Sequence, residues 1–310
     1  MEATQMKFMK SMAKQKGRFF LLLTASYTKY HKEVIKMNKG KLYICPTPIG
    51  NLEDITLRTL RILGEVDLIA CEDTRHSLKL LNHYDIKKPL TSYHEHNIRE
   101  KGPELIHKLL EGQNIALITD AGMPGISDPG EDIIKMAIEE GIEVVGLPGP
   151  SASITALVVS GLATDKFAFE GFLPSKKRDR IRELEELVKE KRTTIFYESP
   201  HRLLASLSDI LEKLGNRKIA IIRELTKLHE EIYRGDFKGA IQKFEASQVK
   251  GELVIIVEGN KEVEEITVDI QEELKKHIES GMTMKDAIKT VSKEYKIPKN
   301  KVYSESLELT

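Results

Sequence analysis

From residue 41 onward, short apolar runs alternate along the chain with longer stretches in which apolar residues recur at helical spacing. Runs of four or five apolar residues are typical of strands, and the periodic stretches are typical of helices that cover a sheet. The predicted strands of this first half are Leu42–Cys45, Leu68–Cys71, Leu90–Tyr93, Ile115–Thr119 and Val144–Leu147. The predicted helices are Leu57–Leu63, Ser77–Tyr84, Lys101–Leu110 and Glu131–Glu139. This alternation predicts an α/β layer with a mainly parallel sheet, whose ligands bind beyond the carboxyl ends of the strands.

A second block of alternating elements follows the loop at Gly149–Ser151. Its predicted strands are Phe167–Phe172, Thr194–Tyr197, Ile219–Arg223, Glu231–Arg234 and Leu253–Val257, and its predicted helices are Arg180–Lys191 and Leu203–Leu214. The last three strands lie close together in the sequence, with little room for helical crossovers. We therefore expect this half to be a second α/β domain that includes antiparallel pairs.

A third pattern begins near residue 262. Ile270, Leu274 and Ile278 recur every four residues, and Gly281 is placed to end that helix. A second apolar stripe follows at Ala287, Ile288, Val291 and Tyr295, and Pro298 interrupts the chain before Val302–Leu307. The pattern predicts a small helical module at 262–310, after α/β domains at 37–152 and 153–261.

Composition limits the classes of function that the chain can have. The chain has 310 residues, of which 40% are hydrophobic and 31% charged, and its formal net charge is zero. A neutral total does not indicate a nucleic-acid partner, so any RNA site must be a local patch of cations. The two cysteines, Cys45 and Cys71, lie in apolar runs without a paired spacing, which indicates buried thiols in a reducing cytosol.

The first 36 residues differ from the rest, because they carry eight Lys or Arg and two Asp or Glu. Their apolar run Phe19–Leu23 is far shorter than the roughly 20 residues that a membrane span needs, and we expect no membrane association. Met37 stands just before the first strand. We expect residues 1–36 to lie outside the functional fold, with Met37 as an alternative start. A working basic arm is the other interpretation.

The most informative loop is Asp120–Gly130, which joins a predicted strand to a predicted helix and contains three glycines and two prolines. Glycine permits tight turns and a close approach of ligand to backbone. Asp128 is predicted to cap the following helix, with Pro129 at its first position, so a purely structural turn is the alternative interpretation. The loop matches neither common phosphate-binding fingerprint. An amino-acid-like ligand, held by main-chain groups and one carboxylate, fits it better.

Two further Gly/Pro loops end predicted strands, Pro46–Asn51 and Leu147–Ala152. If the sheet is parallel, the three loops converge on one rim and form a single binding site.

These loops and other short motifs together resemble one family. The motifs are Pro46–Asn51, Glu72–Arg75, Tyr93–Asn97, Asp120–Gly130, Leu147–Ala152, Gly171–Pro174, Tyr197–Arg202 and Glu224–Lys227. They are similar to signatures of the ribosomal RNA small-subunit methyltransferase I family, cytidine 2′-O-methyltransferases within the tetrapyrrole methylase superfamily. The likeness runs from about Lys41 to Gly259, and we expect it to extend to Leu307. Residues 1–36 have no place in it.

The resemblance implies two α/β domains with S-adenosylmethionine in the cleft between them, a cytoplasmic homodimer, and methylation of a cytidine in the decoding region of 16S rRNA, not of DNA. The motif match gives these cofactor-binding candidates: Pro46, Asp120, Gly122, Met123, Pro124, Gly125, Ile126, Ser127, Ser151 and Phe172.

Methylation of a ribose hydroxyl needs an acceptor for its proton or support for developing negative charge. The candidates are Glu95, His94, His96, Lys227, Asp73 and Glu198, of which Glu95 and Lys227 are preferred. Each has a structural alternative, such as an ion pair or a helix start. His94 and His96 alone do not provide enough ligands for a metal, and we predict none.

RNA contact needs exposed cations near the site. One candidate cluster is Lys176, Lys177, Arg178 and Arg180, and the second is the stripe of Lys285, Lys289, Lys293 and Lys296. Ordinary solvated helix faces are the alternative for both. Two rival functions stay open: a superfamily enzyme acting on a small tetrapyrrole, which needs no such cations, and a non-catalytic ribosome-assembly factor, which needs no cofactor cleft.

Overall fold

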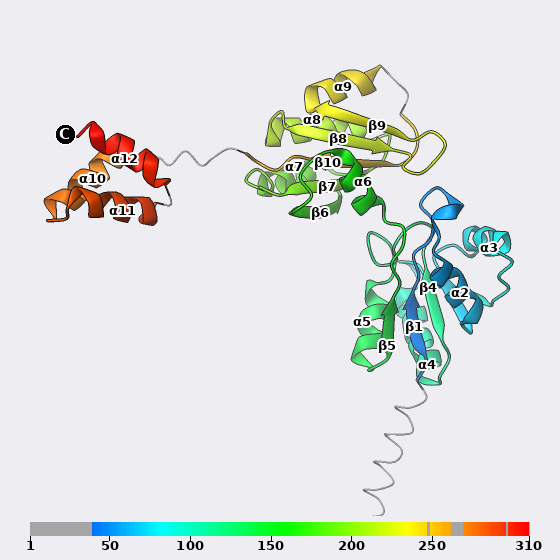
Figure 1. Ribbon diagram of the computed structural model, residues 1–310. Helices are drawn as coiled ribbons and strands as arrows, with labels where there is room; N and C mark the ends of the chain where they lie inside the picture. Colours follow the sequence, from blue (N-terminus) through cyan, green and yellow to red (C-terminus); the bar gives the residue numbers. More distant parts are fainter. Residues whose placement is uncertain (1–38, 247–248, 262–268, 296, 310) are drawn as a thin grey trace, which may run out of the picture. The chain divides into compact units, whose positions relative to one another are not determined.

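The structure is a computed structural model that describes residues 39–246, 249–261, 269–295 and 297–309. The chain divides into two compact units, with the boundary between Gly259 and Asn260 (Figure 1). The predictions for residues 1–36, for a start at Met37 and for Lys296 lie outside the described residues. Within the described residues, no helix has the length and apolar character needed to cross a bilayer.

The first half of the larger unit is a five-stranded parallel sheet with the strand order β3-β2-β4-β1-β5. All four residues of the central strand β4 are buried. The strands are β1 (Lys41–Ile44), β2 (Leu68–Cys71), β3 (Leu90–Ser92), β4 (Ile115–Ile118) and β5 (Glu143–Gly146). The predicted parallel α/β layer is confirmed, with strand bounds within one residue of those expected.

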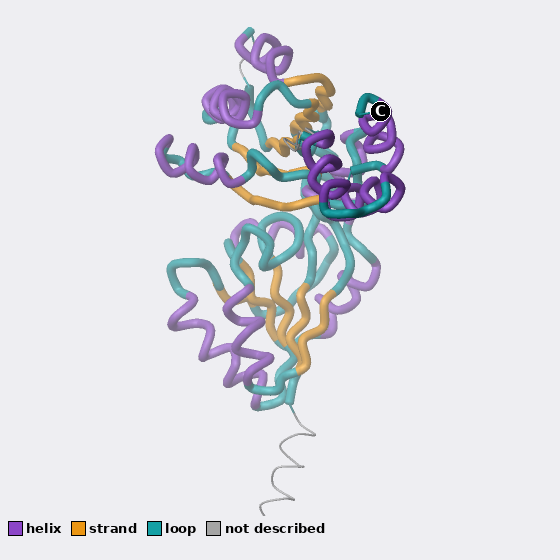
Figure 2. The backbone as a smooth tube through the Cα atoms, turned by 90° about the vertical axis from the view of Figure 1, so that its left-hand side faces the viewer, coloured by secondary structure: helices purple, strands orange, loops and turns teal. Residues whose placement is uncertain are grey.

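Helices cover both faces of this sheet (Figure 2). They are the 3-10 turn η1 (Leu52–Asp54), α2 (Leu57–Glu65), α3 (Thr74–His83), α4 (Ile98–Leu110) and α5 (Glu131–Glu139). Because alternate strand residues point to opposite faces, Leu117 packs against α4 and α5. Its neighbours Ala116 and Ile118 pack against α2 and α3 instead. The sheet is therefore buried on both sides, and a ligand reaches it only at a strand end.

The start of α5 corrects one prediction. Gly130, with φ of 154°, precedes the helix, and Asp128 makes no capping hydrogen bond to it. Asp128 and Pro129 therefore belong to the loop. Glycine is required at position 130, because a Cβ atom there would lie 2.9 Å from the Gly125 nitrogen.

The second half of this unit is a mixed sheet with the strand order β6-β7-β10-β8-β9. Strand β6 pairs in parallel with β7, whereas β10 runs antiparallel to both β7 and β8, and β9 runs antiparallel to β8. The strands are β6 (Phe167–Phe172), β7 (Thr193–Glu198), β8 (Lys218–Arg223), β9 (Glu231–Asp236) and β10 (Leu253–Val257). The expected antiparallel pairs are confirmed.

Helix α6 (Ala152–Ser160) packs on one face of the mixed sheet. The other face is covered by α7 (Lys177–Glu186), α8 (Leu203–Leu214) and α9 (Phe237–Glu245). The sequence pattern predicted α8 with its observed bounds, placed α7 too far along the chain and missed α6 and α9. Helix α6 is apolar on nearly every face, so it shows no helical periodicity in the sequence.

The terminal unit contains three helices in its described part, α10 (Ile270–Glu279), α11 (Met284–Glu294) and α12 (Lys299–Leu307). Leu274, Val291 and Val302 are fully buried in its core, one from each helix. Gly281, with φ of 95°, follows the last turn of α10, and Thr283 caps α11 by accepting a hydrogen bond from the Asp286 backbone. The predicted helical module is confirmed.

Candidate active site

The three Gly/Pro loops meet at one edge of the parallel sheet. Strands β4, β1 and β5 are neighbours, so their carboxyl ends lie side by side. Thr47 and Gly122 exchange two backbone hydrogen bonds, of 2.9 and 3.0 Å, which join the first loop to the second. A Cβ atom on Gly149 would lie 2.8 Å from Pro46, so the third loop packs directly on the first. The predicted convergence of the three loops is confirmed.

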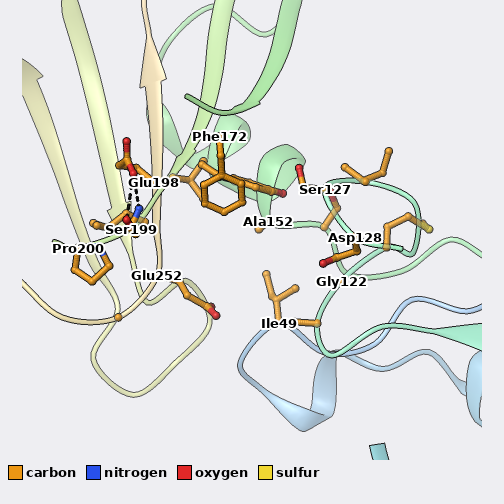
Figure 3. Close-up of a pocket in the computed structure, with 18 residues that line it drawn as sticks. Ile49, Gly122, Ser127, Asp128, Ala152, Phe172, Glu198, Ser199, Pro200 and Glu252 are labelled. Carbon is orange, nitrogen blue, oxygen red and sulfur yellow. Dashed lines mark hydrogen bonds between the residues drawn. The ribbon is translucent and has the colours of Figure 1, made fainter. Parts of the chain in front are cut away.

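A cavity of about 320 Å³ lies at this edge (Figure 3). One wall of the cavity comes from the loops of the parallel sheet. The opposite wall comes from the mixed sheet, at the ends of β6 and β7 and the start of β10. The lining residues are Ile49, Ala121, Gly122, Met123, Ile126, Ser127, Asp128, Ser151, Ala152, Phe172, Tyr197, Glu198, Ser199, Pro200, Gly251, Glu252, Leu253 and Val254. The two sheets therefore share one concave site.

The predicted cofactor residues fall into two groups. Those that line the cavity are Gly122, Met123, Ile126, Ser127, Ser151 and Phe172. Pro46, Asp120, Pro124 and Gly125 are not among the described lining residues. Pro46 supports the third loop, and an Asp120 oxygen accepts a hydrogen bond of 3.3 Å from the Asp73 backbone. These residues shape the wall from behind.

An aromatic surface forms one side of the cavity. Phe172 is 54% exposed, and its ring packs edge-on to that of Tyr197 at a centroid distance of 5.5 Å. Tyr197 in turn packs edge-on against Phe169, at 5.0 Å. An exposed ring supported by a second ring is suited to stack on a flat base such as adenine.

The wall also carries three carboxylates, at Asp128, Glu198 and Glu252 (Figure 3). Glu198 is buried and pairs with Arg202, at 3.2 Å, and it also accepts a hydrogen bond from the Ser206 hydroxyl. Glu252 pairs with Lys227 at 3.0 Å. Burial, and then the negative charges of nearby carboxylates, raise the pKa of Asp128 to about 7. The site is acidic and suits a cationic ligand.

The preferred catalytic candidates, Glu95 and Lys227, are not among the described residues that line the cavity. Glu95 is exposed in the loop after β3. Lys227 donates hydrogen bonds to Glu224 and Glu252, at 2.9 and 3.0 Å. Burial lowers the pKa of Lys227, but these hydrogen bonds outweigh it and the pKa is raised overall. Lys227 is therefore a cation at neutral pH, which suits support of developing negative charge better than uptake of a proton, and its catalytic role stays a prediction.

The other candidate bases make local contacts. An Asp73 oxygen caps α3, and the His94 ring lies 3.3 Å from the Asn97 amide. The His94 and His96 rings are 6.0 Å apart. Among the described residues, no three His, Cys, Asp or Glu side chains are grouped so that they could hold a metal ion.

The four side chains of the first cation cluster differ in their exposure to solvent. Lys176, Lys177 and Arg178 are exposed, as RNA contacts must be. Arg180 is only 5% exposed, and its guanidinium pairs with Asp209 at 2.6 Å and donates to the carbonyls of Pro174 and Ser175. Arg180 as an RNA contact is therefore wrong, because a buried and fully paired guanidinium cannot reach a phosphate.

The second cluster lies on α11. Lys285, Lys289 and Lys293 are all exposed, and no ion pair links them to another residue in the described part of the chain. Ala287, Ile288 and Val291 face the core instead. The helix thus separates a cationic face from an apolar one, as its sequence pattern predicts.

Sequence reasoning missed several residues of the cavity. Glu252 is the clearest case, because it precedes β10, and only the antiparallel pairing of Leu253 with Glu198 brings it to the rim. No local signal marks that pairing. Asp128 was noticed but interpreted as a helix cap, and its position after Gly125 and before Gly130 was the available signal for a loop instead.

Comparison with known proteins gives the class of this fold and site. Residues 41–241 match the family Tetrapyrrole (Corrin/Porphyrin) Methylases. The crystal structure of the methyltransferase CobJ superposes with a TM-score of 0.54 at 16% sequence identity, covering 71% of this chain and 94% of that one. The crystal structure of diphthine synthase gives 0.53 at 12% identity, over 70% and 89% of the two chains. At such identities these two likenesses concern the fold alone.

Similarity to curated proteins is much closer. The chain is 49% identical to "Ribosomal RNA small subunit methyltransferase I" of Halalkalibacterium halodurans, over 86% of this chain and 94% of the relative. It is 46% identical to the protein of the same name from Bacillus subtilis, over the same shares. The chain therefore belongs to the tetrapyrrole methylase family and, within it, to the group that carries this name. It is a methyltransferase, and S-adenosylmethionine is its methyl donor.

The cavity fits this donor. S-adenosylmethionine carries a sulfonium and an ammonium group, and the wall offers the carboxylates of Asp128 and Glu252. Its adenine requires a flat apolar surface, which the Phe172 ring provides, and Ile49 adds an aliphatic contact surface. Gly122 brings main-chain groups to the wall with φ of 82°, a conformation that side chains disfavour.

Proposed function

We propose that this chain transfers a methyl group from S-adenosylmethionine to the 2′-hydroxyl of a cytidine ribose in the 16S RNA of the small ribosomal subunit. The observation that carries the proposal is the 49% identity, over 86% of the chain, to a protein named as a small-subunit ribosomal RNA methyltransferase. The choice of a cytidine 2′-hydroxyl rests on the motif resemblance, above all on Tyr93–Asn97, Asp120–Gly130 and Tyr197–Arg202.

The chain's own residues contribute mainly by positioning. S-adenosylmethionine, when bound, supplies an activated methyl group, whose transfer is an in-line displacement at carbon. Holding the acceptor oxygen about 3 Å from that carbon can supply much of the rate. Phe172 and Met123 supply contact surface, and the acidic wall favours a cationic donor. Lys227, held as a cation beside Glu252, is proposed to limit the negative charge of the rim, and Glu95 stays a proposed contributor on its motif alone.

RNA binding is assigned to two groups of exposed cations. Lys176, Lys177 and Arg178 lie just after the Phe172 loop, which lines the cavity. Lys285, Lys289 and Lys293 belong to the terminal unit. The proposed division of the chain is two α/β domains, at 37–152 and 153–261, followed by this unit at 262–310. Phosphates are the natural partners of such exposed cations. The working form is proposed to be a cytoplasmic homodimer, as the family resemblance implies.

The test is methyl transfer from labelled S-adenosylmethionine to purified small subunits that lack the modification. The expected product, after complete digestion of the RNA, is 2′-O-methylcytidine in a stoichiometry approaching one per subunit. Free 16S RNA and assembled subunits are compared as substrates. A label found only on a base, or no transfer to either RNA substrate, would contradict the proposal.

Action on a small tetrapyrrole is the competing function, because structures that share the fold include a cobalamin biosynthetic enzyme. Its test uses the same labelled donor with a uroporphyrinogen-type acceptor in place of RNA. The exposed lysines of α11 favour the RNA substrate, since a small acceptor has no use for a separate cationic helix.

A further inference from the structure

The three carboxylates of the cavity wall differ in what they contact. Glu198 is held by Arg202 and accepts hydrogen bonds from Ser206 and from the Ser199 backbone. Glu252 is held by Lys227. Asp128 makes no hydrogen bond and no ion pair with any residue in the described part of the chain. Of the three, Asp128 alone has both oxygens available to a ligand.

The backbone directs this carboxylate into the cavity. Ser127, the residue before it, has φ of 60°, a left-handed conformation that is unfavourable for a non-glycine residue. Gly125 and Gly130 also have positive φ, so the chain turns sharply on both sides of Asp128. Figure 3 shows the Asp128 carboxylate pointing into the open space on the side facing Glu252. Strain of this kind persists where surrounding structure maintains it, commonly at functional sites.

Three carboxylates from different elements act on Asp128. Glu72 follows β2, Asp120 follows β4, and Glu252 precedes β10, and each of these carboxylates acts on Asp128 electrostatically. The Tyr197 hydroxyl of β7 also interacts electrostatically with Asp128. Burial and these like charges favour the protonated form of the carboxyl. A carboxylate in such a place gains a proton readily at neutral pH and returns it to water without difficulty.

We propose that Asp128 is the group that accepts the proton of the methylated hydroxyl, an assignment that rests on the proposed function. As the new O–C bond forms, the O–H bond breaks and its proton passes to an oxygen of Asp128. The S–C bond of the donor breaks at the same time, and its electron pair stays on sulfur, which becomes a neutral thioether. The sulfonium cation and the carboxylate anion are thus neutralised together, and the proton leaves to water after the product departs.

The experiment compares the wild-type protein with Asp128→Asn, which keeps the shape of the side chain but cannot take up a proton. Single-turnover methyl transfer to small subunits is expected to fall by about 10²–10⁴-fold in Asp128→Asn. Calorimetry is expected to show a much smaller loss of affinity for S-adenosylmethionine, at most about tenfold, because the Glu252 carboxylate stays on the wall as a partner for the cationic donor. Equal losses in rate and in donor affinity would overturn the proposal, because Asp128 would then be a donor-binding group only.

A readout without turnover follows the carboxyl itself. In protein labelled with [¹³C]aspartate, one carboxyl resonance is expected to titrate near pH 7 and to be missing from Asp128→Asn. Glu252→Gln removes one of the like charges and serves as the matched variant. It is expected to move that titration, and the acid limb of the single-turnover pH profile, to lower pH. An Asp128 carboxyl that titrates below pH 5 overturns the assignment.

The two possible failures are distinguishable. If the wild-type protein yields no 2′-O-methylcytidine, the proposed function fails and the assignment of the proton fails with it. If the wild type yields that product and Asp128→Asn does so within about tenfold of the wild-type rate, the proposed function stands and only Asp128 is wrong. Urea unfolding of Asp128→Asn checks that the variant is folded.

Discussion

The buried pair of Arg180 and Asp209 offers a sharp test of the structure. Arg180 lies on α7 and Asp209 on α8, and they are 5% and 4% exposed. The guanidinium contacts Asp209 at 2.6 Å and donates to the carbonyls of Pro174 and Ser175, at 3.0 and 3.1 Å. Those carbonyls belong to the loop that follows Phe172, so the pair anchors one wall of the cavity.

The perturbation is Arg180→Met, which keeps much of the volume and removes the charge. Removing one partner of a buried ion pair costs about 3–5 kcal/mol, because the other charge stays buried without compensation. Lys177 also contacts Asp209, at 3.2 Å, but its side chain is 69% exposed. An exposed partner of this kind recovers about 1 kcal/mol at most. The net cost is therefore about 3 kcal/mol.

The assay is thermal unfolding followed by circular dichroism. In a unit of this size, 1 kcal/mol lowers the melting temperature by about 2–4 °C, so Arg180→Met should melt about 6–12 °C below wild type. Lys177→Gln is the matched control, with an expected loss of at most about 2–4 °C. Because the anchored loop directly follows Phe172, which lines the cavity, the affinity for S-adenosylmethionine should also fall in Arg180→Met and not in Lys177→Gln.

Two results would refute this reasoning. A variant Arg180→Met that melts within about 2 °C of wild type would mean that the pair contributes no stability. A reduced salt dependence of subunit binding in a still stable Arg180→Met would mean that this guanidinium contacts phosphate after all. Arg178→Gln, at an exposed position in the same helix, is the comparison that should reduce the salt dependence.

Three further outcomes are expected. Changing Lys285, Lys289 and Lys293 together to Gln should weaken binding to small subunits. In filter binding at several salt concentrations, the slope of log binding constant against log salt concentration should fall by about 0.7–0.9 per lost phosphate contact. Calorimetry should show an unchanged affinity for S-adenosylmethionine. Ile288→Ala should destabilise the terminal unit by about 2–5 kcal/mol in a urea titration, because Ile288 is 5% exposed in its core. The pKa of Asp128 is raised to about 7 by burial and then by neighbouring carboxylates, against about 4 in an unfolded chain, so the stability of the wild type falls as pH rises from about 4 to about 7 and then levels off. Asp128→Asn should therefore gain stability over wild type at pH 8 and little at pH 4, and equal differences at both pH values would contradict the shift.

Much of the fold could be predicted because its signals are local. The apolar runs of β1, β2 and β4 are bounded by turn residues, and their length and spacing identify parallel strands. Helices α5 and α8 alternate polar and apolar faces, so their bounds were predicted as observed. Helix α6 was missed because its residues are apolar on nearly every face, including the exposed Ile154 and Val158, so its sequence carries no periodic signal.

The rim of the site was also accessible to sequence reasoning. Three Gly/Pro loops follow three predicted strands, and in a parallel sheet such loops must meet at one edge. The two hydrogen bonds between Thr47 and Gly122 confirm that the first two of these loops are joined. The motifs of those loops led to the correct family. These features depend on residues that are close together in the sequence.

Burial and long-range pairing were decided by the tertiary structure alone. Arg180 belongs to a run of cations in the sequence, yet the packing of α7 on α8 turns it inward to Asp209 and leaves Arg178 exposed. Glu252 reaches the cavity only because β10 runs antiparallel to β7. The sequence thus determined which segments form strands, helices and ligand-binding loops, because those depend on neighbouring residues. Whether a charged side chain can contact a ligand or RNA depends on which distant parts of the chain pack against it.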